Sequence, residues 1–237
     1  KPTEKDLEWL KKKYHFHQII LEELKKPSAR PRVEGYDNYL YFIYQFPVFD
    51  EIEMVSRRNE IDILVTKRDV ITVHYEGLQA LEEAKRSFSR PSVLKEAFRS
   101  QMHLTYFILK KLIEFSQRQL DHIDEKVEAV AKKLFKNHEK EVLREISYLK
   151  RDLSEYRIIV RSQEHFIKSL LEAGVKFWGT ESRVYLHDVL GDYVKLANQL
   201  EDYREAVSDF EDTNNQLMNI KTTEVAKTFT ILSFMTF

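Results

Sequence analysis

Proline and glycine are distributed very unevenly along this chain of 237 residues. All five prolines lie within the first 91 residues, and from Ser92 onward there is no proline and only three glycines. Because these two residue types interrupt regular backbone structure, a mixed first part and a long-helical second part are predicted. We expect an α+β fold with three units: an α/β domain over 1–91, two long antiparallel helices over 92–181 and a stalk helix over 182–237.

The first part alternates between helical and extended patterns. Helices are expected over 3–14, with Thr3 as the N-cap, and over 17–26, where Pro27 ends the helix. Aromatic and β-branched residues in alternating patterns then predict three strands, followed by a helix over 78–88. The strands are expected to form a small antiparallel or mixed sheet, flanked by helices, from segments 39–49, 60–66 and 69–75.

The second part is predicted to contain three long helices. The first follows Pro91 and covers 92–135, the second covers 140–171, and the segment 172–182 breaks the chain before the third. The third helix begins near Ser182 and meets no helix breaker from Asp192 to Phe237. At about 1.5 Å per residue, that stretch makes a rod of roughly 70 Å. Such a helix needs partners, because long helices are seldom stable alone.

The character of the third helix changes along its length. Apolar side chains recur at steps of three and four residues, which predicts a stripe that packs on neighbouring helices: Leu186, Leu190, Tyr193, Ala197, Leu200, Tyr203, Val207 and Phe210. After Phe210 polar residues take over, and Asp212, Asn219, Thr223 and Thr230 share one face. One arrangement that accounts for this face is a bundle of identical helices around a wet axis, with lipid or protein outside.

The chain ends in "EVAKTFTILSFMTF", which has no charge after Lys227. The apolar run from Thr228 to Phe237 is shorter than the roughly 20 residues that span a bilayer. It therefore cannot cross a membrane as it stands. Two interpretations remain open: the frayed end of a core helix, or the first half of a membrane-spanning helix that is incomplete here.

Composition excludes several classes of function. Lys and Arg number 38 against 39 Asp and Glu, so there is no basic excess of the kind that nucleic-acid-binding proteins show. The absence of cysteine excludes a disulfide framework and a thiolate metal site. The five glycines form no phosphate-binding loop, and no serine stands in a nucleophile motif. We therefore do not expect an enzyme.

One pair of carboxylates is a candidate cation site. Asp188 and Asp192 lie one helical turn apart and share a face of the third helix. Two carboxylates at this spacing can hold a hard cation together with water, although a complete Mg²⁺ or Ca²⁺ shell needs more oxygen ligands. The other groups of histidine and acidic residues are interpreted as solvated surface: His15 with His17, Asp121 to Glu125, and His138 to Glu141.

Three segments carry a resemblance to a known family. "RPRVEGYDNYLYFIYQF" is similar to a stretch that leads into an aromatic strand, and "EIDILVTKRDVITVH" to the strand pair that follows. The segment from Arg183 to Phe237 is similar, in order and without gaps, to a stalk helix that enters a membrane. Together they resemble the cytoplasmic domain of the CorA family of magnesium and divalent-cation transport proteins, over essentially the whole chain.

The resemblance implies a homopentamer at the cell membrane, with this chain on the cytoplasmic side and five stalks lining a cation path. Mg²⁺, or alternatively Co²⁺, Ni²⁺ or Zn²⁺, is implied as both transported and regulatory ion. Carboxylates between subunits hold the family's channel closed, and Asp188 matches one such position. Gln79 occupies its partner position, which leaves two alternatives: Glu82 or Glu83 substitutes for it, or this member senses cations weakly or elsewhere. Asp192 is a further candidate ligand beside Asp188. Implied pore-facing positions are Asp212, Asn219, Thr223, Ala226 and Thr230, of which Ala226 stands where the family often has Met.

Two other interpretations remain open. In the first, the chain is part of a Zn²⁺ transporter of the same superfamily, with or without proton coupling. In the second, it is a helical scaffold or oligomerisation protein that uses its long helices without any ion. The family's Gly-Met-Asn motif would lie beyond Phe237, so we do not expect this chain to transport ions by itself.

Overall fold

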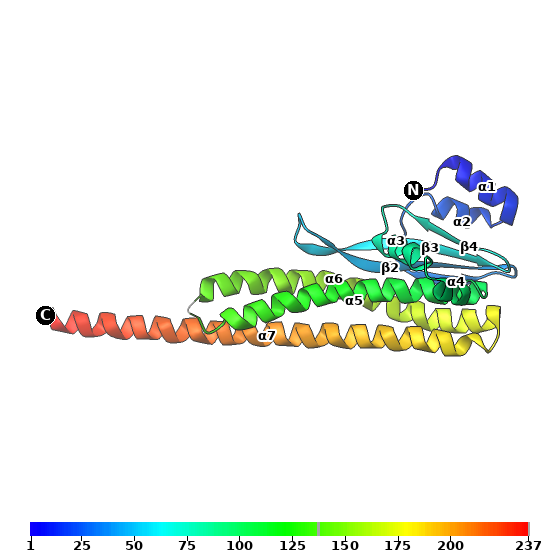
Figure 1. The fold of residues 1–237 in the computed structure, drawn as a ribbon. Helices are drawn as coiled ribbons and strands as arrows, with labels where there is room; N and C mark the ends of the chain where they lie inside the picture. The colour runs from blue at the N-terminus through cyan, green and yellow to red at the C-terminus, as the bar shows by residue number, and fades with distance from the viewer. Residues whose placement is uncertain (137, 237) are drawn as a thin grey trace.

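The structure of the protein, a computed structural model, describes residues 1–136 and 138–236. A small sheet lies along one side of three long helices, and two short N-terminal helices cover the opposite face of the sheet (Figure 1). One of the long helices extends far beyond the rest of the molecule, and its end carries the C-terminus (Figure 1). This arrangement confirms the predicted α+β fold class.

The two N-terminal helices are α1 (Glu4–Tyr14) and α2 (Gln18–Glu23). Thr3 caps α1 as predicted, because its Oγ1 accepts a hydrogen bond from the Asp6 N–H at 3.3 Å. Asp6 completes a capping box, since its carboxylate accepts a hydrogen bond from the Thr3 N–H at 2.7 Å. The helix therefore begins where its first free N–H groups find side-chain partners.

The sheet has four strands in the order β1-β2-β3-β4, and every neighbouring pair is antiparallel. The predicted alternative of a mixed parallel and antiparallel sheet is therefore wrong, because short connections join successive strands and reverse the chain direction. The sequence patterns also missed β1, which has only four residues, and the polar first half of β3. The strands are β1 (Arg32–Gly35), β2 (Tyr39–Asp50), β3 (Val55–Thr66) and β4 (Val70–His74).

Strand β2 connects the two halves of the core. Its alternate side chains point to opposite faces of the sheet, and nearly all of them are buried. On the inner face Phe42 and Phe46 meet Phe166 and Phe115 of the long helices, with ring centroids 5.9 Å apart in both pairs. On the outer face Tyr39, Tyr41 and Ile43 pack in an apolar cluster with α1 and α2. Full burial of each large side chain contributes roughly 1.5–3 kcal/mol.

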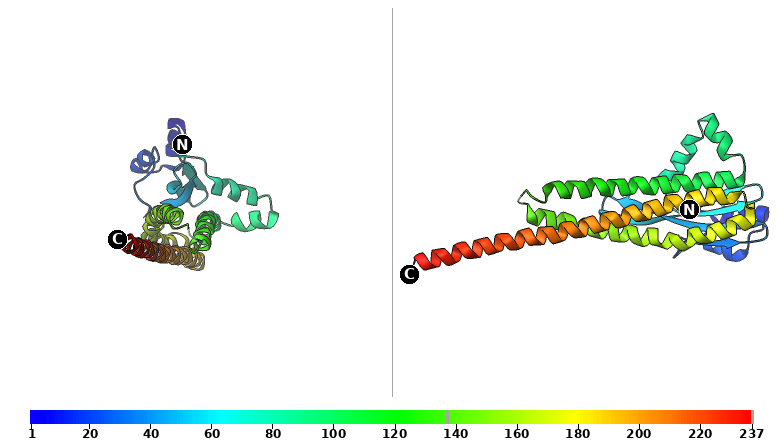
Figure 2. Two further views of the ribbon diagram at one scale, coloured as in Figure 1. Left: turned by 90° about the vertical axis from the view of Figure 1, so that its left-hand side faces the viewer. Right: turned by 90° about the horizontal axis from the view of Figure 1, so that it is seen from below.

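The helices that follow the sheet differ from the prediction at two breaks. The helix expected over 92–135 is divided, because Ser100 is extended and caps α5 by accepting the His103 N–H at 3.3 Å. The short pieces α3 and α4 project sideways from the long helices (Figure 2). The five helices are α3 (Gln79–Ser87), α4 (Pro91–Ala97), α5 (Gln101–Lys133), α6 (Glu139–Trp178) and α7 (Ser182–Met235).

The second break lies later than predicted. Helix α6 runs through Gly174 and ends at Gly179, whose φ of 96° favours glycine. Gly174 is a packing position rather than a breaker: a Cβ there would lie 2.7 Å from Leu186 Cδ1 and 2.9 Å from Trp178 Cζ3. The absence of a side chain at this position lets the start of α7 approach the end of α6.

Helix α7 begins at Ser182, as predicted, and continues to Met235. The predicted apolar stripe is confirmed, because its members are buried or half-buried against α5 and α6. Val189 and Leu196 belong to the same buried line. Phe237, where we expected the helix to end, lies outside the described residues.

The two helical glycines make a matched pair for a stability test. We expect Gly174→Ala to lower the free energy of unfolding by about 1–2 kcal/mol, because the added methyl group overpacks the contact with Leu186 and Trp178. Gly191→Ala, in open space on α7, should raise it by up to about 1 kcal/mol through helix propensity. Urea denaturation measures both changes, and equal stabilisation by the two variants would contradict the packing role of Gly174.

Candidate functional site

Polar side chains at intervals along helix α7 form hydrogen bonds and ion pairs with the other long helices. The Tyr185 hydroxyl lies 3.2 Å from Nε2 of His103 on α5. The Gln199 side-chain oxygen accepts a hydrogen bond from the Gln117 side-chain amide of α5 at 2.8 Å. Glu201 pairs with Arg157 of α6 at 2.6 Å. These contacts, with the buried apolar line, fix which side of α7 faces its neighbours.

The last of these contacts lies at the beginning of α6. Asn214 is fully buried and donates a hydrogen bond to the Glu139 carbonyl at 3.1 Å, and Lys221 pairs with the Glu139 carboxylate at 2.6 Å. Beyond Lys221 every described residue of α7 is exposed. The fourteen residues from Thr222 to Met235 therefore project as a single helix of about 21 Å.

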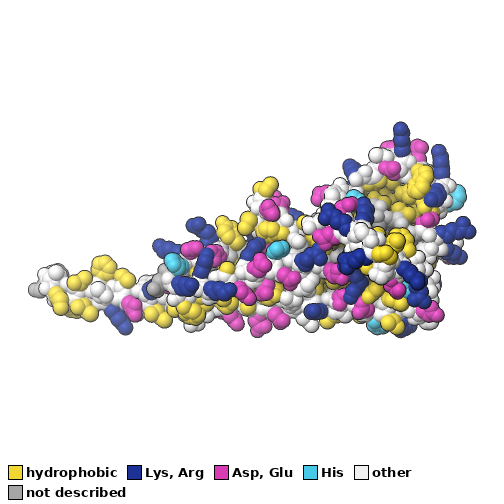
Figure 3. Space-filling view, viewed as in Figure 1, with side chains coloured by type: hydrophobic (Ala, Val, Ile, Leu, Met, Phe, Trp, Pro, Cys, Tyr) yellow, Lys and Arg dark blue, Asp and Glu magenta, His cyan; other side chains and the backbone are white. Residues whose placement is uncertain are grey.

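The projecting segment exposes apolar side chains and carries few charged ones (Figure 3). Phe234 is 82% exposed and Met235 is 77% exposed, and Phe229, Ile231 and Leu232 are more than half exposed. The described part of this segment is a regular helix, and no other described part of the chain packs against it. No helix in the described part of the chain combines the length and the apolar character that crossing a membrane requires.

The five predicted pore-facing residues lie on the side of α7 that faces away from α6. At about 100° per residue, they stand roughly 120–180° around the helix from the buried Asn214. All five are exposed, and we call them the outer stripe: Asp212, Asn219, Thr223, Ala226 and Thr230. The Thr223 and Thr230 hydroxyls donate to carbonyls one turn earlier, both at 2.9 Å. The stripe is thus a line of polar and small side chains that no described part of the same chain covers.

The candidate carboxylate pair is bridged by a lysine. Lys110 of α5 pairs with both Asp188, at 2.9 Å, and Asp192. The Tyr106 hydroxyl, one turn before Lys110, donates to Asp188 at 2.7 Å. In this single chain the ammonium group of Lys110 therefore occupies the place between the carboxylates where a cation would be expected.

These contacts shift the pKa values of the groups involved. The hydrogen bond from Lys110, followed by that from Tyr106, lowers the pKa of Asp188. Burial alone would lower the pKa of Lys110, but its hydrogen bonds to Asp192 and Asp188 outweigh burial and raise it. Burial and the bond to Asp188 raise the pKa of Tyr106 to about 12. The carboxylate of Asp188 thus stays ionised and the lysine stays charged at neutral pH.

The other predicted cation ligands lie on α3 and have partners of their own. Glu82 pairs with Lys85 at 2.7 Å, and Glu83 pairs with Arg118 of α5. Gln79 donates a hydrogen bond to Glu83 at 3.1 Å. No described hydrogen bond or ion pair joins these residues to Asp188 or Asp192, and the described part of the chain contains no group of three or more acidic or histidine residues arranged for a metal.

Sequence patterns missed Lys110 and Tyr106. Their spacing of one helical turn places them on one face of α5, but their partners lie about 80 residues away. Only the packing of α5 against α7 brings the two faces together. A pair of long-range contacts of this kind leaves no local signal in a single sequence.

The lysine bridge can be tested by titration. In Lys110→Met we expect the pKa of Asp188 to rise toward its ordinary value of 3.8, because its main stabilising partner is lost. Carbon-13 NMR of the aspartate carboxyl groups measures this shift. The stability change should stay within about 1 kcal/mol, since both groups are partly exposed. In the native protein this contribution is present above pH 4 and is lost as pH falls through the lowered pKa of Asp188.

The control for this titration is Lys111→Met. Lys111 pairs with Glu114 within α5 and makes no described contact with α7. The pKa of Asp188 should be unchanged in this variant. An unchanged pKa in Lys110→Met as well would contradict the bridging role.

Comparison with known proteins gives similar sequences over nearly the full chain. The chain is 22% identical over 222 residues to a cobalt/magnesium transport protein CorA from Thermotoga maritima, covering 93% of this chain and 62% of the relative. It is 23% identical over 234 residues to a cobalt/magnesium transport protein CorA from Methanocaldococcus jannaschii, covering 98% of this chain and 72% of the relative. The chain thus spans about two thirds of the length of these relatives.

Solved structures share the fold. The complete CorA magnesium transporter of M. jannaschii matches with a TM-score of 0.81 at 22% identity, covering 98% of this chain and 72% of that one. Its soluble domain matches with a TM-score of 0.76 at 22% identity, covering 91% of this chain and 85% of that one. The family model for the CorA-like Mg²⁺ transporter protein matches residues 1–236. The chain therefore belongs to the CorA-like Mg²⁺ transporter family.

Proposed function

We propose that this chain is the cytoplasmic sensing and stalk part of a homopentameric divalent-cation channel in the cell membrane. The observation that carries the proposal is the outer stripe on α7. It is a line of polar and small side chains that faces away from the chain's own core. Five such helices around one axis would cover the stripe and surround a hydrated path.

The projecting segment of α7 fits a helix that continues into the membrane. The segment is about 21 Å long and exposes its apolar side chains, and it is shorter than the roughly 30 Å hydrocarbon core of a bilayer. In the proposed pentamer the stripe faces the axis, and Val225 and Leu232, on the opposite side of the helix, face lipid. Thr223, the small Ala226 and Thr230 continue the outer stripe into this segment.

Mg²⁺ is the proposed cargo, with Co²⁺, Ni²⁺ and Zn²⁺ as related candidates. The relatives named as cobalt/magnesium transport proteins support this assignment. Uncharged oxygen groups such as the Asn219 amide and the Thr223 hydroxyl suit an ion that gives up its water reluctantly. They can bind the hydration shell without holding the ion too tightly to pass.

We also propose that divalent cations regulate the assembly at Asp188. A cation shared with a neighbouring subunit would compete with Lys110 for the Asp188 carboxylate, with Asp192, Glu82, Glu83 and Gln79 as candidate further contributors. A bound ion favours whichever state of the pentamer binds it more tightly. Competition with a resident lysine gives a weak site, which suits sensing in the millimolar range.

Ion uptake by the complete gene product in liposomes tests this function. The chain contains no cysteine, so single cysteines can be introduced without interference. In Thr223→Cys, a charged thiol reagent should reduce Mg²⁺ uptake at least tenfold, because it places a bulky charge on the proposed path. Thr222→Cys is the matched control, since its side chain is equally exposed but about 100° away around the helix.

Two results would contradict the proposal. One is an absence of Mg²⁺, Co²⁺, Ni²⁺ and Zn²⁺ uptake by an assembly that is shown to be intact. The other is equal inhibition of the two cysteine variants. Competition among the four ions in the same assay identifies the preferred cargo, and Asp188→Ala should allow uptake to persist at internal Mg²⁺ levels that close the unsubstituted protein.

A further inference from the structure

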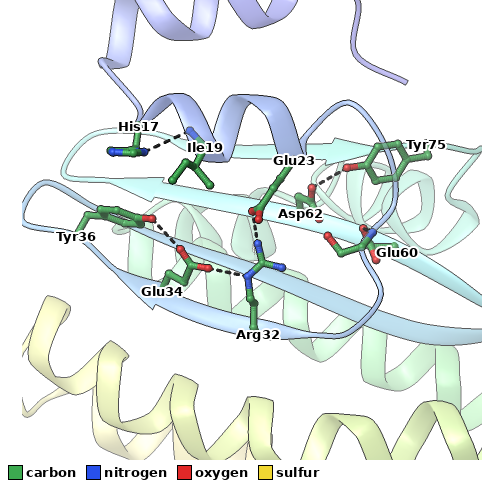
Figure 4. Close-up of polar contacts among 10 residues, drawn as sticks. His17, Ile19, Glu23, Arg32, Glu34, Tyr36, Glu60, Asp62 and Tyr75 are labelled. Atoms are coloured by element: carbon green, nitrogen blue, oxygen red, sulfur yellow. Dashed lines mark hydrogen bonds and ion pairs between the residues drawn. The ribbon is translucent and has the colours of Figure 1, made fainter.

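A cluster of charged side chains lies on the outer face of the sheet beneath the end of α2 (Figure 4). Arg32 pairs with Glu34 at 2.6 Å and with Glu23, so its single positive charge is shared between two carboxylates. Two further acidic side chains lie close by on β3 (Figure 4). We call these residues the outer acidic cluster: Glu23, Arg32, Glu34, Glu60 and Asp62.

Asp62 is the most deeply buried member of this cluster. It has no exposed surface and lies in the middle of β3, opposite Ile43 on β2 and Val73 on β4. Its Oδ2 accepts a hydrogen bond from the Tyr75 hydroxyl at 2.8 Å, but its Oδ1 has no partner in the described structure. The Tyr41 hydroxyl is also fully buried and without a described partner. An ionised carboxylate in this position is costly, because half of its acceptor capacity is unused.

The groups that face Asp62 come from every surrounding element. They are Glu23 from α2, Arg32 from β1, Tyr41 from β2, Glu60 from β3 and Tyr75 just after β4. Burial, together with the nearby Glu60 and Glu23, raises the pKa of Asp62 to about 7, and the Tyr75 hydrogen bond and the charge of Arg32 oppose this rise. The covered arrangement therefore favours a protonated Asp62.

Glu60 cannot relieve this repulsion by moving away. Its carboxylate accepts the Ser28 N–H at 2.8 Å and the Gln45 side-chain amide at 2.7 Å. Ser28 lies in the segment that joins α2 to β1. Glu60 therefore has two roles: it holds the segment that follows α2, and its charge makes ionisation of Asp62 more costly.

The N-terminal helices that form this cover are held by a small number of contacts. An apolar cluster joins α1 and α2 to the sheet, the His17 N–H donates to the Tyr39 hydroxyl at 3.2 Å, and Glu23 pairs with Arg32. We propose that Asp62 is a proton-binding site whose occupancy controls how firmly α1 and α2 cover the outer face of the sheet. The site is separate from the outer stripe and from Asp188, so the proposal does not depend on the proposed ion path.

The direction of the effect follows from linkage. When α2 lifts and water reaches Asp62, its pKa returns toward the ordinary value of 3.8. The covered state therefore binds more protons than the open state, and covering weakens as pH rises from about 4 to about 7. Between pH 6 and pH 8 the ratio of covered to open molecules should fall about tenfold and then level off.

Hydrogen–deuterium exchange of peptides from α2 measures this ratio. Exchange is followed from pH 5.5 to pH 8.5, with labelling times scaled to the intrinsic exchange rate at each pH. In the native chain the protection of the α2 amides should fall about tenfold between pH 6 and pH 8. In Asp62→Asn, which is neutral at every pH, protection should stay constant across this range.

Two further variants make the test decisive. Asp37→Asn removes an exposed carboxylate from the connection between β1 and β2 and should leave the pH dependence unchanged. Tyr75→Phe removes the hydrogen bond that favours ionised Asp62, so its transition should move to higher pH even if Asp62→Asn folds poorly. Protection that is independent of pH in the native chain, or an unmoved transition in Tyr75→Phe, would overturn the proposal.

Discussion

The packing of the apolar stripe of α7 against α5 and α6 determines the rest of the functional arrangement. Once Leu186, Tyr193 and Val207 are buried, the rotation of the helix about its axis is fixed. Because α7 is one continuous helix, that rotation is carried to its far end. The outer stripe must then face away from the bundle, and Asp188 must face Lys110. The position of the proposed ion path is thus set by hydrophobic packing along the preceding turns of the same helix.

Sequence patterns predicted the long-range organisation because it depends on strong, repeated signals. The proline-free second part, the apolar stripe and the polar face after Phe210 all follow from spacing alone. The sequence patterns failed where a single local contact determines whether a helix ends or continues. A break was predicted over 172–182, but α6 continues through Gly174, which Leu186 and Trp178 make a packing position. Ser100 interrupts an otherwise good helical sequence because it caps α5, and β1 is too short for any periodicity to show.

The candidate site was predicted in part. Asp188 and Asp192 share a face and a partner, as their spacing suggests, but that partner is a lysine on another helix. Gln79, Glu82 and Glu83 form their described pairs with residues of α3 and α5. In the proposed assembly, contacts between chains would bring them to Asp188. Such contacts leave no local pattern in a single sequence. The proposed sensing site therefore requires contacts between chains, whereas the position of the outer stripe is determined by the fold of a single chain.

The central claim is that the outer stripe faces a shared axis in the assembled protein, and cross-linking of single-cysteine variants tests it most directly. Treatment of the membrane-embedded protein with a short bismaleimide should convert Thr223→Cys largely into a covalent dimer on a denaturing gel. Thr222→Cys should remain monomeric under the same conditions, because its side chain points about 100° away. Equal dimer yields from the two variants, or dimer from Thr222→Cys alone, would contradict the account.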